Sequence, residues 1–90
     1  MRSSDLVQTR LPVRRRGGRF GIEAVDDFLE QCTRALGAQE RGRQPELTAE
    51  DVVAVQFPTV ALFTPGYDSD AVDELLDEVA AQLREGSSDG

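Results

Sequence analysis

The chain repeats one pattern of residues at a spacing of about half its length. The segment 25–30 (VDDFLE) returns as 72–77 (VDELLD), and the segment 5–7 (DLV) returns as 51–53 (DVV). A single unit of about 40 residues is close to the size below which a domain needs a disulfide, a metal or a partner to stay folded. Two such units are therefore expected to bury each other's apolar faces. Repeats of this kind favour a scaffold or binding module over an enzyme.

The residue inventory argues against catalysis. The chain contains one cysteine, Cys32, and no histidine. An internal disulfide, a cysteine zinc site and a thiolate–imidazolium pair are therefore excluded, and Cys32 is expected to be a small buried residue. A calcium loop starting at Asp68 would need glycine where Asp73 stands, and Gly17-Gly18 lacks the lysine of a phosphate-binding loop. We expect no enzymatic activity, no cofactor and no metal.

Charge is distributed unevenly along the chain. Residues 1–19 contain six arginines and one acidic residue, whereas residues 20–90 contain four arginines and sixteen acidic residues. The sequence has no apolar run of about 18 residues and no apolar segment typical of a secretory signal near its start. We expect a cytoplasmic protein, at most peripheral on the inner face of the cell membrane. Nucleic acid is not an expected partner, because most of the chain would repel phosphate.

Each repeat has the pattern of a short helix, an extended loop and a long amphipathic helix. The predicted organisation is a first unit over residues 1–37, a polar linker over residues 38–46, a second unit over residues 47–86 and a disordered tail over residues 87–90.

Several residues mark where the helices should begin and end. Thr48 and Asp51 fit a capping box at the second short helix, and Asp68 fits the cap of the second long helix. Gly37 and Gly86 follow the last apolar positions of the two long helices, where a left-handed glycine commonly ends a helix. We expect each long helix to stop at its glycine.

Apolar residues recur every three or four positions in both long helices, which is the stripe of an amphipathic helix. We therefore predict an all-α fold in which the long helices pack antiparallel as a helical hairpin. The residues expected in the shared core are Val25, Phe28, Leu29, Cys32 and Leu36 from the first helix and Val72, Leu75, Leu76, Val79 and Leu83 from the second.

The two loops hold the residues expected to contact a membrane or a partner. The first loop mixes arginines with apolar residues, and the second has no charge over residues 57–67. Exposed apolar residues beside arginines suit an anionic membrane surface, where each basic residue contributes about 1 kcal/mol. The arginines equally suit docking on the acidic second long helix, within the chain or across a dimer. The candidate contact residues are Leu11, Val13, Arg14, Arg15, Arg16, Arg19, Leu62 and Phe63.

The second unit resembles the DivIVA domain. The resemblance covers most of residues 47–85 and is carried by 47–52 (LTAEDV), 57–58 (FP) and 66–79 (GYDSDAVDELLDEV). The first unit looks like a divergent copy of the same domain. It keeps VDDFL but has Arg19-Phe20-Gly21 in place of Gly-Tyr-Asp. The chain as a whole is similar to small actinobacterial proteins with two DivIVA repeats.

This resemblance implies a non-catalytic scaffold or adaptor of bacterial cell division or polar growth. Members of the family bind curved membrane, self-associate and recruit division or cell-wall proteins. The expected partners are therefore other proteins of this machinery, a second copy in a homodimer, and an anionic membrane surface. One departure concerns Phe63, which has no basic neighbour in its own loop. The alternative is a purely structural protein-interaction module with no membrane role.

Overall fold

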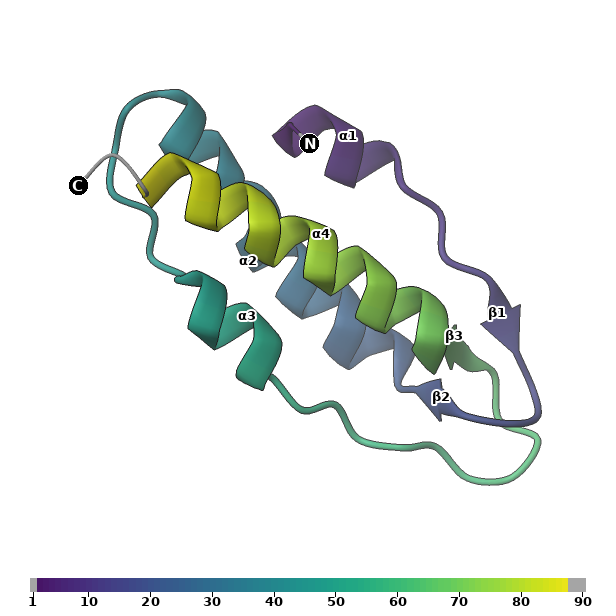
Figure 1. Ribbon diagram of the computed structural model, residues 1–90. Coiled ribbons are helices and arrows are strands. Elements are labelled where there is room, and N and C mark those ends of the chain that lie inside the picture. The colour runs from purple at the N-terminus through teal and green to yellow at the C-terminus, as the bar shows by residue number, and fades with distance from the viewer. Residues whose placement is uncertain (1, 88–90) are drawn as a thin grey trace.

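The structure, a computed structural model, describes residues 2–87, and each repeat supplies one short and one long helix with short strands between them (Figure 1). The short helices α1 and α3 lie on opposite sides of the pair formed by α2 and α4, and the strands gather at one end of this pair. The elements are α1 (Ser3–Gln8), β1 (Val13–Arg14), β2 (Arg19–Phe20), α2 (Ile22–Glu40), α3 (Ala49–Ala54), β3 (Gly66–Asp68) and α4 (Ser69–Ser87).

The two extended loops form a small antiparallel sheet, so the prediction of an all-α fold is wrong and the fold is mixed α and β. The strand order is β1-β3-β2, which places the strand of the second repeat between the two strands of the first. Tyr67, at the centre of β3, pairs with Val13 on one side and with Phe20 on the other. Strands of two or three residues are too short to show an alternating apolar pattern, which is why the sequence did not predict them.

The paired residues reveal an approximate twofold relation between the repeats. Phe20 and Tyr67 occupy equivalent positions in the two repeats and pair with each other. Val13 pairs with Tyr67, and Thr59, the equivalent of Val13, forms an isolated bridge with Phe20. Each loop therefore contacts the other in the same way around a local axis near Phe20 and Tyr67.

Backbone hydrogen bonds outside the strands follow the same relation. The N–H of Asp68 donates to the carbonyl oxygen of Pro12 at 2.9 Å, and the N–H of Gly21 donates to the carbonyl oxygen of Pro58 at 3.0 Å. Gly21 is the equivalent of Asp68, and Pro58 is the equivalent of Pro12. The duplication seen in the sequence is thus a duplication of contacts as well as of elements.

The long helices run in the same direction, so the predicted antiparallel hairpin is wrong. Gly21 alone separates β2 from α2, and α4 follows β3 without a break. At this end the Tyr67 hydroxyl donates to Oδ1 of Asp26 at 2.7 Å, and at the far end Nε2 of Gln39 donates to the carbonyl oxygen of Gln82 at 2.9 Å. Because both helices leave the same small sheet, both begin at the same end of the molecule.

The predicted helix starts in the second repeat are confirmed. Oγ1 of Thr48 accepts a hydrogen bond from the N–H of Asp51 at 3.1 Å, and Oδ2 of Asp51 accepts one from the N–H of Thr48 at 3.0 Å. Oδ2 of Asp68 accepts a hydrogen bond from the N–H of Ala71 at 3.1 Å. These side chains satisfy N–H groups that have no partner within the helix itself.

The predicted helix ends are wrong. α2 continues through a buried Gly37 to Glu40, so the first residues of the expected linker are helical. α4 likewise continues through Gly86 to Ser87, and the remainder of the expected disordered tail, residues 88–90, lies outside the described residues. At Gly37, packing within the protein outweighs the weak helix propensity of glycine.

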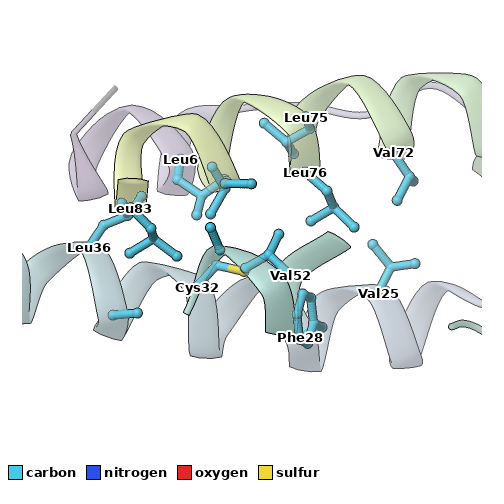
Figure 2. Close-up of a cluster of buried hydrophobic side chains, with 14 residues drawn as sticks. Leu6, Val25, Phe28, Cys32, Leu36, Val52, Val72, Leu75, Leu76 and Leu83 are labelled. Carbon is cyan, nitrogen blue, oxygen red and sulfur yellow. The ribbon is translucent and has the colours of Figure 1, made fainter. Parts of the chain in front are cut away.

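The core lies between α2 and α4 and is completed by the short helices (Figure 2). All the expected core residues are buried except Leu29, which is partly buried against the same cluster. Leu6 of α1 and Val52 of α3 are also buried, with 3% and 0% of their surface exposed. These two residues are equivalent in the repeats, so each short helix contributes the same anchor to the core.

A polar contact also holds α1 to the end of α2. The N–H of Ser3 donates to Oε2 of Glu40 at 2.6 Å, and Oγ of Ser3 donates to Oε1 of Glu40 at 2.9 Å. These hydrogen bonds favour the ionised carboxylate and lower the pKa of Glu40 below its usual value. The short helix α1 is thereby tied to the last turn of α2.

Truncation of Leu76 tests the core. Leu76 is 5% exposed and lies among the labelled core side chains of Figure 2, so Leu76→Ala should lower the free energy of unfolding by about 2–5 kcal/mol. Leu62→Ala is the matched control, because Leu62 is 73% exposed, and its effect should stay within about 0.5 kcal/mol. Urea denaturation followed by circular dichroism measures both. Equal effects of the two substitutions would contradict the assigned core.

Candidate contact surface at the end of the two loops

The two loops meet at the end of the molecule that carries the sheet, opposite the last turns of α2 and α4 (Figure 1). Most of the predicted contact residues are exposed in these loops. We call this set the loop pole, and it consists of Val13, Arg14, Arg15, Arg16, Leu62 and Phe63.

Leu62 and Phe63 form the apolar tip of the second loop. Their side chains are 73% and 54% exposed. The N–H of Thr64 donates to the carbonyl oxygen of Ala61 at 3.0 Å and closes a tight turn around them. Phe63 has a φ of 67°, a left-handed conformation that costs a bulky residue on the order of 1–3 kcal/mol. The turn therefore keeps an exposed aromatic ring at a position where glycine would fit better.

Arginines of the first loop reach the second repeat. The guanidinium of Arg16 lies 5.5 Å from the centre of the Phe63 ring, within the range of a cation–π interaction. Nε of Arg14 lies 3.2 Å from Oδ1 of Asp68, the residue that caps α4. Arg15 is exposed and makes no ion pair within residues 2–87. The loop pole thus combines an apolar tip with three guanidinium groups, one of which is paired.

Arg19 is not part of the exposed surface. Its side chain is only 6% exposed, and its guanidinium donates hydrogen bonds to three backbone carbonyl oxygens: Thr64 at 3.0 Å, Gly17 at 2.7 Å and Ala61 at 2.9 Å. Buried polar groups need such partners to offset the loss of water. Arg19 therefore positions the turn that carries Leu62 and Phe63, which corrects its assignment as a contact residue.

Leu11 also lies away from the exposed tip, since it is partly buried against the core. A residue whose role the sequence did not reveal is Gly66. A Cβ at Gly66 would lie 2.7 Å from the carbonyl oxygen of Phe20 and 3.0 Å from Cβ of Arg19. Gly66 and Arg19 are equivalent in the repeats, so the strands leave room for a side chain at only one of the two positions. The difference between Gly66 and Arg19 was visible in the sequence, but its meaning depends on the strand pairing.

Tyr67 and Phe20 connect the sheet to the long helices by different interactions. The Tyr67 hydroxyl donates to Asp26 on α2, and this hydrogen bond, together with burial, raises the pKa of Tyr67 above its usual value. Phe20 has no hydroxyl and packs on Phe57 with ring centres 5.4 Å apart. Phe57 in turn packs edge-on against Phe28 at 5.7 Å. The equivalent positions thus differ in polarity.

The environment of the single cysteine does not favour a reactive thiol. Cys32 has no exposed surface, and burial raises the pKa of its thiol to about 12. A thiol that stays protonated is a poor nucleophile and a poor metal ligand. Cys32 therefore acts as a small apolar residue at the position that Val79 fills in the second repeat.

Comparison of the chain with protein-family models, with curated proteins and with solved structures finds no match. Within residues 2–87, every helix is too short or too polar to cross a bilayer. The resemblance to DivIVA thus depends on the quoted sequence motifs alone.

Replacement of Arg19 tests its positioning role. Arg19→Ala should lower the free energy of unfolding by about 2–4 kcal/mol, because three carbonyl groups lose a charged donor. Arg19→Lys should recover only part of this loss, since an ammonium cannot reproduce the fork of a guanidinium. The exposed Arg15→Ala is the control and should change stability by less than about 0.5 kcal/mol. Chemical denaturation measures the stability of all three variants. An Arg19→Ala variant as stable as the native protein would contradict the positioning role of Arg19.

The buried thiol predicts a loss of stability at alkaline pH. Unfolding allows the Cys32 thiol to ionise near its ordinary pKa of 9.0, whereas the folded thiol ionises only at about 12. The free energy of unfolding should therefore fall as the pH rises above 9. Cys32→Val, which copies the residue at the equivalent Val79, should lack this contribution. Thermal melts between pH 7 and 11 measure the difference, and identical pH profiles for the two proteins would contradict it.

Proposed function

We propose that this protein is a non-catalytic adaptor that binds an anionic membrane surface through the loop pole and binds other proteins elsewhere on its surface. The observation that carries the proposal is the exposure and the backbone conformation of Phe63. Its ring is exposed at a loop tip, in an unfavourable backbone conformation, beside the guanidinium of Arg16. Backbone strain of this kind persists where the surrounding structure enforces it, and it concentrates at binding sites.

The loop pole combines the two contributions that attach a protein to a membrane surface. Burial of a leucine or phenylalanine side chain is worth about 1.5–3 kcal/mol, and each basic residue near anionic lipid adds about 1 kcal/mol. The apolar part comes from Leu62 and Phe63 in the second loop, and the basic part comes from the first loop. Contact of this size gives reversible, peripheral binding.

Docking of the arginine loop on the acidic helix within the chain has less support. Within residues 2–87, Arg14 is the one arginine of this loop that forms an ion pair, and its partner Asp68 is the cap of α4. Arg19 bonds backbone carbonyl groups. Arg15 and Arg16 form no ion pair with the described residues and are exposed at the end of the molecule, where an external anionic surface can reach them.

The resemblance to DivIVA supplies the biological setting of the proposal. On this basis the protein acts in the bacterial cytoplasm, at the inner face of the cell membrane, and recruits proteins of cell division or polar growth. Self-association as a homodimer would place two loop poles on one membrane and increase the avidity of the contact.

Vesicle co-sedimentation tests the membrane contact. We expect the protein to bind vesicles of phosphatidylcholine mixed with phosphatidylglycerol, and not vesicles of phosphatidylcholine alone. The double substitution Arg15→Ala/Arg16→Ala should weaken binding about tenfold or more, because two contributions of about 1 kcal/mol are lost. Arg41→Ala/Arg43→Ala is the matched control: it removes two exposed arginines beyond the last turn of α2 and should leave binding unchanged.

A second variant separates membrane contact from folding. Phe63→Gly removes the aromatic ring but introduces the residue that favours a φ of 67°, so the protein should stay folded while vesicle binding is lost. If the native chain does not bind phosphatidylglycerol vesicles, or if the control pair weakens binding as much as the loop pair, the membrane contact is wrong. The protein would then be an interaction module with no membrane role.

A further inference from the structure

A groove runs between each short helix and the long helix of the same repeat. The groove between α3 and α4 has a volume of ≈ 570 Å³. Its apolar lining includes Val53 and Leu76, and the acidic residues Asp73 and Asp77 also line it. The groove between α1 and α2 has a volume of ≈ 610 Å³ and is lined by the equivalent positions of the first repeat: Val7, Leu29, Asp26 and Glu30.

Both grooves expose a valine of the short helix. Val7 on α1 is 68% exposed, and Val53 on α3 is 52% exposed. The neighbouring residues Leu6 and Val52 are fully or almost fully buried, so the short helices do not need Val7 or Val53 for their attachment to the core. Two equivalent apolar residues therefore remain on the outer side of the molecule.

The acidic residues of the two grooves differ in their surroundings. In the first repeat the Tyr67 hydroxyl occupies Oδ1 of Asp26, and Arg34 lines the same groove as Glu30. In the second repeat Phe20 stands in place of Tyr67 and offers no hydroxyl.

Asp73 and Asp77 are exposed on α4 at the edge of the second groove. Neither carboxylate has a hydrogen bond or an ion pair within the described part of the chain. The groove that they line includes no basic residue. No basic residue of the groove offsets these two negative charges, whereas Arg34 lines the equivalent groove of the first repeat.

We propose that the groove between α3 and α4 is the docking site for a basic amphipathic helix of a partner protein. The apolar side of such a helix would cover Val53 and the partly exposed Val55 and Phe57, and its lysines or arginines would meet Asp73 and Asp77. These two acids lie one helical turn apart, about 6 Å along α4, which matches basic residues spaced by four positions on the incoming helix. Helix-in-groove recognition of this kind uses apolar anchors at the same spacing.

The negative charge of the groove favours a basic helix over an anionic membrane as its occupant. An anionic membrane would be repelled by Asp73 and Asp77, whereas a basic helix would be attracted. The docking site rests on the adaptor function proposed above, since it supplies the protein contact of that adaptor. Its residues do not overlap with the loop pole, so each contact can be removed without the other.

Selection from a peptide library tests the docking site. The probe is a phage-displayed library of random peptides of about 12 residues, long enough for three helical turns, selected on the folded chain. We expect the enriched peptides to combine lysine or arginine with leucine, isoleucine or phenylalanine at helical spacing. Synthetic copies should bind in fluorescence anisotropy, and their affinity should fall as the salt concentration rises.

Equivalent positions of the two repeats give matched variants. Val53→Glu should weaken binding of the enriched peptides by about tenfold or more, and Asp73→Asn/Asp77→Asn should weaken it and remove most of its salt dependence. Val7→Glu places the same charge on the equivalent residue of the first repeat and should leave binding unchanged. All of these positions are exposed, so thermal melting should show that each variant remains folded.

Several outcomes would overturn the docking site. They are a selection that enriches no peptide, peptides without basic residues, and equal effects of Val53→Glu and Val7→Glu. Self-association of the chain that Val53→Glu abolishes would also overturn it, because the occupant would then be a second copy. Vesicle binding by Val53→Glu distinguishes the two proposals: a variant that still binds phosphatidylglycerol vesicles but loses the peptide has lost the docking site alone.

Discussion

The central strand β3 is the constraint on which the remaining structure depends. It belongs to the second repeat, yet both of its edges pair with strands of the first. Gly66 permits this arrangement, because a side chain there would collide with the backbone of Phe20. Neither repeat contains a sheet of its own, so neither can complete its fold without the other. The chain is therefore one cooperative unit, although its sequence reads as two.

The sequence predicted the two long helices and their core well because the apolar stripe of each helix extends over several turns. Residues such as Val25, Phe28, Val72 and Leu75 repeat over several turns, and this stripe identifies the buried face without knowledge of the partner. The strands have no such signal, since each is only two or three residues long. The direction of the helices depends on those strands, so the error in fold class led to the error in helix packing. The exposed loop residues were identified by composition, but Arg19 could not be distinguished from the arginines at 14, 15 and 16 until its partners in the second loop were known.

Two differences between the repeats lie next to the local twofold axis. Arg19 replaces Gly66, and its guanidinium fills the space between the loops and holds the turn at Phe63. Phe20 replaces Tyr67, which leaves Asp73 without the hydroxyl that Asp26 receives. Each change breaks the symmetry of a surface: Arg19 supports the turn of the second loop alone, and Phe20 leaves the groove between α3 and α4 without the hydroxyl that is bonded to Asp26 in the other groove. Divergence of the copies, rather than the duplication itself, creates the surfaces to which function is assigned.

An aromatic cluster separates these two surfaces and fixes their relative position. Phe57 stands just before the second loop, and Phe20 stands just before α2. Their rings contact each other, and Phe28 connects them to the core. Both Phe20 and Phe57 line the groove between α3 and α4, while the chain that follows Phe57 leads to Leu62 and Phe63. Substitutions at exposed residues can therefore alter one surface and leave the other in place, whereas truncation of Phe57 would remove the packing that supports both.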